Sequence, residues 1–336
     1  MQTFRGKNGF QLLQSALLVL GLSLLSMLYP SGQVSAVSRL GCLGAAAGEY
    51  FLPGAGYAFT RQWDKAAIFG GLRWIAINQY SSAVNSEYYQ KDIDSIYSVI
   101  KAEDSDSGKT ETSIVLNKET WVADYYGSLY SNLLLITWGD LYQNECEPNT
   151  QTYEVMLSPF RFDQFYKKWT FWLPMAMSIV NYAYFSDNSK VDYLLKRGLR
   201  ESELKRDTFS QFYMVGVGEE MFFRGTVQHH LFHTLMVDWD FSPETSRHLS
   251  VVGASVFFAA AHNGEGLTAS PLGALLFGIY EGYVYHPSLS EFDLTTAIAI
   301  HAWWDILVSY AILNHADFTE TQKAVHVPII RVGFNF

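Results

Sequence analysis

The sequence has few charged residues and almost no cysteine. Asp, Glu, Lys and Arg make up 17% of the 336 residues, whereas a typical soluble domain contains about 25%. The chain is therefore short of the groups that normally cover a water-facing surface. Cys42 and Cys146 are the only cysteines, which excludes a disulfide scaffold. The apolar share of 49% and the absence of a repeat exclude a disordered or coiled-coil chain.

Basic residues are also too few for a nucleic-acid-binding protein. The chain has 23 Lys and Arg against 33 Asp and Glu, a net charge of −10. No basic stripe interleaved with aromatic residues occurs, so nucleic acid is not expected as a partner. The mean hydropathy of +0.03 averages long apolar blocks with polar loops. Those blocks predict an integral membrane protein.

The N-terminal part, residues 1–36, predicts either a signal peptide or a first transmembrane helix. Residues 10–29 carry no charge, and such a run of about 20 residues matches a bilayer span. The small residues at 34–36 instead suit cleavage by signal peptidase. Both alternatives stay open at this point.

Residues 37–164 are predicted to form an N-terminal membrane region with an exposed polar loop at 85–118. Residues 66–84 are typical of a membrane span in which Arg73 needs a partner or an interfacial position. Residues 40–59 are apolar but contain Glu49, one proline and several glycines. This composition predicts a broken helix that is re-entrant or peripheral.

Further apolar segments predict an all-α, polytopic fold with about seven or eight membrane helices. Beyond 10–29 and 66–84, they are 119–142, 166–186, 208–237, 249–263, 268–286 and 293–314. The last five predict a C-terminal helical bundle at 165–316, followed by a tail at 317–336. The basic segment 187–207 is expected on the cytoplasmic side. An even number of spans, with 40–59 not crossing, would place the basic residues near the N-terminus on that same side.

Two acidic residues and an arginine lie inside the apolar segment 208–237. Glu220 and Arg224 are four residues apart, so they share a helix face and can form an ion pair. Glu219 lies about 100° round the helix from Glu220 and has no such partner on its own helix. A structural ion pair explains Glu220 and Arg224, whereas Glu219 is the better candidate for a proton-transferring base.

Two later segments add histidines. Phe258 and His262 are four residues apart near the end of one segment, and His301 and Asp305 are four apart in the last one. Asp305 could accept a hydrogen bond from one ring nitrogen of His301, which would leave the other nitrogen to face a site. Each pattern alone is also typical of ordinary buried residues.

The three patterns together, Glu-Glu-x-x-x-Arg, Phe-x-x-x-His and His-x-x-x-Asn/Asp, resemble the CPBP family of intramembrane proteases. That family includes the CAAX endoproteases and relatives linked to bacteriocin processing and self-immunity. The resemblance covers about residues 165–316. Asp305 stands where the CAAX enzymes commonly have Asn, so this chain places a charge where they have a neutral amide.

The resemblance implies a glutamic endopeptidase that needs no metal or other cofactor. It implies that Glu219 and His262 activate a water and that His301 and Asp305 line the oxyanion side. It also implies that Glu220, Arg224 and Phe258 support these groups. The expected partners are membrane lipids and a peptide or protein substrate, and the expected location is multi-pass in a bacterial inner membrane.

Other functions fit parts of the same pattern. Glu219, His262 and His301 could instead ligate Zn²⁺ in a zinc-dependent membrane protease, although no His-Glu-x-x-His motif occurs. A non-catalytic immunity or scaffold protein of the same fold would bind a peptide without cleaving it. A transporter would use the buried acids and histidines as a proton relay. The histidines at 229, 230 and 233 are more typical of a partly exposed helix end than of a metal site.

Overall fold

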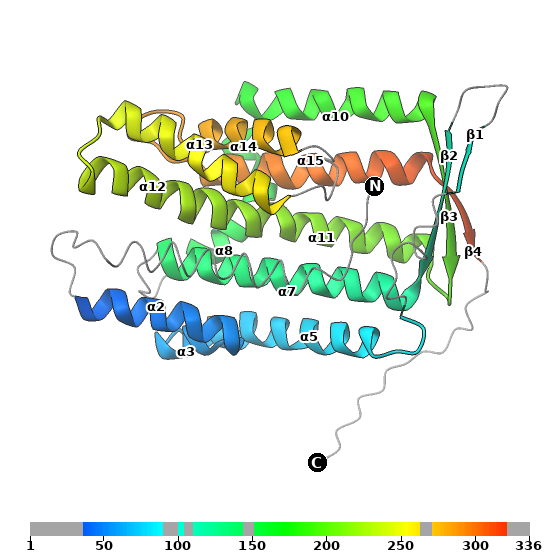
Figure 1. Ribbon diagram of the computed structural model, residues 1–336, viewed down its shortest axis with the longest axis horizontal. Helices are drawn as coiled ribbons and strands as arrows, with labels where there is room; N and C mark the ends of the chain where they lie inside the picture. Colours follow the sequence, from blue (N-terminus) through cyan, green and yellow to red (C-terminus); the bar gives the residue numbers. More distant parts are fainter. Residues whose placement is uncertain (1–35, 90–99, 104–109, 144–150, 263–270, 321–336) are drawn as a thin grey trace, which may run out of the picture.

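The computed structural model describes residues 36–89, 100–103, 110–143, 151–262 and 271–320. Most of this part is helical, and long helices lie side by side with a small sheet across one end (Figure 1). This confirms the predicted all-α bundle. The predicted first helix at 10–29 and its signal-peptide alternative lie outside the described residues, as does 321–336 of the predicted tail.

Each predicted apolar segment from 66 onward forms a helix. The first is η1, Ala66–Gly70, which continues as α5, Gly71–Val84. The others are α7 (Lys118–Gln143), α10 (Trp169–Asn188), α11 (Glu201–Phe222), α13 (Pro243–Ala261), α14 (Pro271–Tyr285) and α15 (Leu294–His315). Helix α11 continues through η3 (Phe223–Gln228), α12 (His229–His233) and η4 (Thr234–Asp238). Short helical turns between α7 and α10 are α8 (Gln151–Met156), η2 (Ser158–Phe160) and α9 (Phe162–Phe165).

The segment 40–59 turns back on itself. Helix α2, Ala36–Phe51, ends before a turn, and α3, Ala55–Phe59, and α4, Trp63–Lys65, follow. Gly54 has a φ of +88°, and a Cβ there would lie 2.9 Å from the carbonyl oxygen of Ala66. Only glycine therefore fits at this turn. The break in the helix agrees with the prediction. That the segment does not cross the membrane stays a prediction. A cysteine-accessibility scan along 40–59 would overturn it by labelling the two ends of the segment from opposite sides of the membrane.

Arg73, which needed a partner, pairs with Glu49 in the interior. Arg73 Nη1 lies 2.6 Å from Glu49 Oε1, and both side chains are fully buried. The two Glu49 carboxylate oxygens also accept hydrogen bonds from the backbone N–H groups of Gly54 (2.8 Å) and Gly56 (2.9 Å). Arg73 Nη2 donates to the hydroxyl of Tyr130 at 3.0 Å. One carboxylate thus fixes the turn after α2 and joins it to α5.

We expect Glu49→Ala to destabilise the protein by about 3–5 kcal/mol, because it leaves the Arg73 charge buried without its partner. Thermal unfolding of the detergent-solubilised protein measures this loss. Replacing both residues with leucine should recover much of the stability, since no buried charge is then left alone. Glu244→Ala, at an exposed position in the first turn of α13, is the control. If Glu49→Ala were as stable as this control, the ion pair would not have the stabilising role given to it here.

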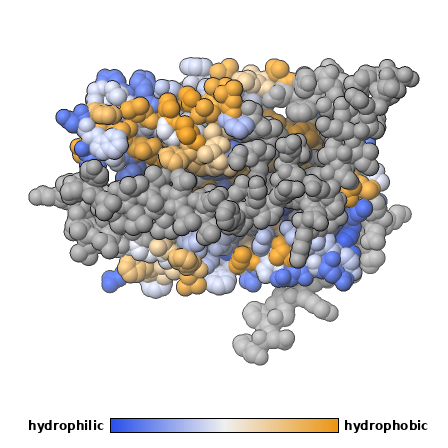
Figure 2. Space-filling view, viewed as in Figure 1, coloured by the Kyte–Doolittle hydropathy of each residue, from blue (hydrophilic) through white to orange (hydrophobic). Residues whose placement is uncertain are grey.

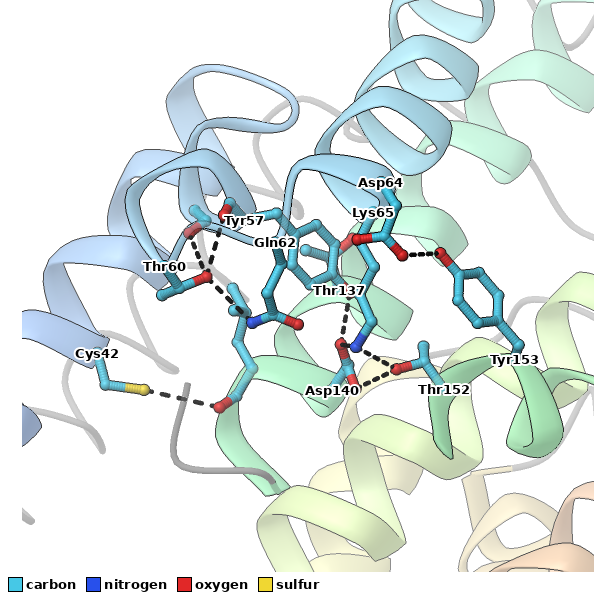
Figure 3. Close-up of polar contacts among 12 residues, drawn as sticks. Cys42, Tyr57, Thr60, Gln62, Asp64, Lys65, Thr137, Asp140, Thr152 and Tyr153 are labelled. Carbon is cyan, nitrogen blue, oxygen red and sulfur yellow. Dashed lines mark hydrogen bonds and ion pairs between the residues drawn. The ribbon is translucent and has the colours of Figure 1, made fainter. Parts of the chain in front are cut away.

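A second buried polar cluster joins the N-terminal helices to α7 (Figure 3). Lys65 Nζ lies 2.7 Å from Asp140 Oδ2 and donates to the hydroxyl of Thr152, also at 2.7 Å. The Tyr57 hydroxyl donates to the same Asp140 oxygen at 2.8 Å. Because these groups satisfy one another, the cluster is a structural link. It fastens the N-terminal unit to the helix that packs against α11.

The sheet was not predicted. Its strands are β1 (Ile100–Glu103), β2 (Thr110–Asn117), β3 (Ser189–Lys196) and β4 (Asp317–Glu320), in that order. Strands β1 and β2 are antiparallel, while β2–β3 and β3–β4 are parallel. An exposed polar loop was predicted at 85–118, and that prediction is wrong for the two segments that form β1 and β2. Parallel pairs join segments far apart in the chain, so local composition gives little sign of them.

Apolar side chains cover much of the outer surface of the bundle. Figure 2 shows apolar residues gathered along the side where α10 and α13 lie. Exposed large apolar residues include Trp74 and Ile75 of α5, Trp172, Ile179 and Val180 of α10, Val252 and Val256 of α13, and Leu272 and Leu276 of α14. Within the described residues, α15 is the one helix long and apolar enough by itself to cross a membrane. The predicted number of spans stays a prediction.

Candidate active site

The structure brings together all the residues of the three motifs. Glu219 and Glu220 lie near the end of α11, and Arg224 follows in η3. His262 is the C-cap residue of α13. His301 and Asp305 lie on α15. Five ion-pair distances, described below, connect these groups into one cluster.

Glu219 contacts a histidine from each of the other two motifs. Its Oε2 atom lies 3.2 Å from His262 Nε2 and 3.9 Å from His301 Nε2. The side chains of Glu219 and His262 are 18% and 20% exposed, whereas His301 is 3% exposed. Glu219 therefore has partners on other helices, although it has none on its own. Glu219, His262 and Asp305 form the partly accessible side of the cluster.

The hydrogen bond behind His262 fixes the proton on its ring. His262 Nδ1 lies 2.8 Å from the carbonyl oxygen of Phe258. A carbonyl oxygen only accepts, so Nδ1 carries a hydrogen and donates it. The other nitrogen, Nε2, faces the Glu219 carboxylate, which also accepts when ionised. A hydrogen bond between these two groups thus requires a proton between them, which suits a pair that exchanges protons with a substrate.

Glu220 links Arg224 to His301. Its Oε2 atom lies 3.1 Å from Arg224 Nε, and its Oε1 atom lies 2.6 Å from His301 Nδ1. The predicted ion pair between Glu220 and Arg224 is present, and both residues are buried. An ionised carboxylate only accepts, so Nδ1 of His301 carries a hydrogen and donates it to Glu220. His301 Nε2 then faces Glu219.

The predicted role of Asp305 needs correction. We expected Asp305 to bind one ring nitrogen of His301 and to leave the other for a site. In the structure Asp305 Oδ2 lies 3.5 Å from Nε2, the nitrogen that faces Glu219, while Glu220 holds Nδ1. Glu220, on another helix, therefore orients the ring. Asp305 instead adds a carboxylate on the side of Glu219.

Close helix contacts place these groups within reach. A Cβ at Gly216 would lie 2.5 Å from the backbone nitrogen of Ala302, the residue after His301. A Cβ at Gly218 would lie 2.8 Å from the carbonyl oxygen of Asn132 in α7. Both glycines lie on α11 just before the two glutamates, so they let α15 and α7 approach α11 at the site.

One buried acid beside the site was not singled out in the sequence. Glu281, on α14, interacts electrostatically with Glu220, Arg224, His301 and Asp305. It lies alone in an apolar segment without a second acid or a basic residue one turn away. No local spacing marks it. Only the packing of α14 against α15 and η3 brings it to the cluster.

The histidines at 229, 230 and 233 form part of a separate cluster. His229 Nδ1 lies 3.0 Å from the hydroxyl of Tyr285, and its ring is 4.6 Å from that of His233. His230 contacts the hydroxyl of Tyr142. Across the described part of the chain, no group of three or more His, Cys, Asp or Glu residues is arranged as a metal site.

Comparison with protein families gives one match. Residues 206–307 match the family described as type II CAAX prenyl endopeptidase, Rce1-like. The match contains all three motifs and confirms the predicted resemblance to the CPBP and CAAX proteases. Neither the curated proteins nor the solved structures gave a match to this chain. Residues 1–205, which include the N-terminal helices and three of the strands, lie outside the matched region.

Proposed function

We propose that this protein is an intramembrane, metal-independent endopeptidase in which Glu219 and His262 activate a water molecule. The contact between Glu219 Oε2 and His262 Nε2, at 3.2 Å, carries this proposal. It joins a carboxylate to a histidine whose other nitrogen is already committed to a backbone carbonyl. The match to the CAAX endopeptidase family supports the same reaction class.

In the proposed reaction Glu219 accepts a proton from the water as its oxygen attacks the scissile carbonyl carbon. The C–O bond forms, the carbonyl π electrons move to the oxygen, and a tetrahedral oxyanion results. His301, held through Nδ1 by Glu220, acts here in its protonated form, in which both ring nitrogens carry a hydrogen, and presents Nε2–H to this oxyanion. The Glu219–His262 pair then returns the proton to the amide nitrogen as the C–N bond breaks. The products are a carboxylic acid and an amine, the base is regenerated, and the acid's proton passes to the amine to leave a carboxylate and an ammonium group.

The proposed substrate is a peptide that reaches the site from the lipid phase. The family description names prenyl endopeptidases, so a C-terminal peptide with a prenylated cysteine is the first substrate class to test. Apolar side chains exposed on α10 and α13 support a lipid environment around the bundle, as a multi-pass membrane protein requires. Membrane lipids are accordingly the second partner that we propose.

The test uses the full-length protein in lipid vesicles with farnesylated and unmodified peptides of the same sequence. Mass spectrometry of the products should show cleavage on the C-terminal side of the modified cysteine. A chelator should leave the rate unchanged. If the chelator abolished activity and added Zn²⁺ restored it, Glu219, His262 and His301 would be metal ligands. Binding of the peptide without cleavage would favour the scaffold function instead.

A further inference from the structure

Glu281 is a buried carboxylate that lies outside all three motifs. Its side chain is 0% exposed, in the middle of the apolar helix α14. Among the residues that the structure describes, neither of its carboxylate oxygens has a hydrogen-bond partner. A buried polar group without a partner is costly, and an apolar residue would fit this helix at no such cost. The cost indicates a role other than stability.

Arg224 supplies a donor that is also without a partner. Its Nε atom lies 3.1 Å from Glu220 Oε2, and its Nη2 atom donates to the carbonyl oxygen of Gly278 at 3.3 Å. The remaining nitrogen, Nη1, is buried and has no hydrogen-bond partner in the described part of the chain. Gly278 precedes Glu281 by three residues, about one helical turn, so the two lie on the same face of α14.

Glu281 thus lies one helical turn beyond a residue that Arg224 contacts. A guanidinium group is a rigid, planar fork of five N–H donors. Glu220 fixes one edge of it, and Glu281 interacts electrostatically with both Arg224 and Glu220. The face of the guanidinium lies 4.6 Å from the ring centre of Phe258. Arg224 therefore contacts Glu220, Phe258 and Gly278, and Glu281 is the nearby acid that none of these contacts uses.

We propose that Glu281 is a positioning residue of the hydrolytic site, acting on His301 through Arg224 and Glu220. This inference rests on the proposed function. Glu281 restrains Arg224 through its charge or through one bound water, and Arg224 holds Oε2 of Glu220. The other oxygen of Glu220 holds His301 Nδ1 at 2.6 Å. Loss of Glu281 would let the side chains of Arg224 and Glu220 shift, and would thereby move His301 Nε2 away from the reacting carbonyl.

The test compares Glu281→Leu and Glu281→Gln by kcat, KM and thermal unfolding temperature. For Glu281→Leu we expect kcat to fall by about 10- to 100-fold, the scale of a misplacement of about 1 Å. KM should stay unchanged, and the unfolding temperature should stay the same or rise, because an unpaired buried acid is removed. Glu281→Gln keeps the size and an acceptor oxygen, so it should retain most of the activity. Tyr280→Phe, whose hydroxyl donates to Thr170 of α10, is the matched control.

The possible outcomes separate this inference from the proposed function. A Glu281→Leu protein with the kcat of the wild type overturns the inference. A Glu281→Leu protein whose loss of kcat is matched by a lower unfolding temperature also overturns it, because the loss then reflects unfolding. Wild-type hydrolysis that Glu219→Gln abolishes supports the function in either case. If the wild type cleaves nothing, the function fails. A double-mutant cycle then tests whether Glu281 and Arg224 interact, by comparing the unfolding temperatures of Glu281→Leu, Arg224→Leu and the double variant. Additive shifts would show no interaction and would overturn the inference.

Discussion

Replacing Glu219 with glutamine is expected to reduce peptide hydrolysis by about 10²–10⁴-fold, the contribution typical of a general base. Glutamine has nearly the same shape but cannot accept a proton from the attacking water. Its amide can still contact His262 Nε2, so the helices should stay in place. Single-turnover cleavage of a peptide by the protein in lipid vesicles measures the chemical step, and the unfolding temperature of the same samples should remain near that of the wild type.

Two further variants make this result specific. Glu219→Asp should retain a trace of activity, because the shorter carboxylate can still polarise a water from an unsuitable distance. Glu244→Gln, at an exposed position on α13, should cleave at the wild-type rate. If Glu219→Gln kept more than a small part of the activity while folded, Glu219 would not be the base. A transporter would instead show loss of pH-dependent flux without any peptide product.

The same assignment implies that the rate falls at acid pH. A proton on the Glu219 carboxylate removes the base, so the fraction of active protein decreases as the pH is lowered. Glu219 Oε2 lies 3.2 Å from His262 Nε2, so we expect the two groups to titrate as a coupled pair, and the midpoint of the rate profile then belongs to the pair rather than to either residue.

The sequence predicted those features that depend on local spacing. Apolar runs located the helices because a membrane span requires about 20 predominantly apolar residues in succession. The spacing of four residues placed Glu220 and Arg224 on one face, and the structure has their ion pair at 3.1 Å. Arg73 was expected to need a partner because an unpaired buried charge is costly, and Glu49 is that partner.

The features that were missed depend on contacts between distant segments. Glu220 was assigned to its own helix, yet its second oxygen binds His301, which lies 81 residues later. Asp305, four residues from His301, was therefore given a role that Glu220 performs. Glu281 is one acid in an apolar helix, and nothing within one turn marks it. The parallel strands β2 and β3 pair residues about 80 positions apart, which no local pattern indicates.

Gly216→Ala is expected to lower kcat by about 10²-fold, because it separates the two helices that carry the site. A Cβ at this position would lie 2.5 Å from the backbone nitrogen and 2.6 Å from the Cα of Ala302. These are backbone atoms, so no side chain can rotate away, and ordinary contact at 3.4 Å or more requires α15 to move by about 1 Å. Ala302 follows His301 directly. The displacement therefore stretches the hydrogen bond of 2.6 Å between His301 and Glu220.

This expectation runs against helix propensity, which makes the test sharp. Alanine is more favourable than glycine in a helix by about 1 kcal/mol, so an unconstrained site would become more stable. Gly71→Ala on α5, where a Cβ would meet nothing within 4 Å, should gain that stability and keep full activity. Ala302→Gly added to Gly216→Ala removes only the Cβ contact at 2.7 Å and leaves both backbone contacts, so it should restore activity only in part. If Gly216→Ala gained stability and kept the wild-type kcat, as we expect of Gly71→Ala, the close approach of α11 and α15 would not be what positions His301.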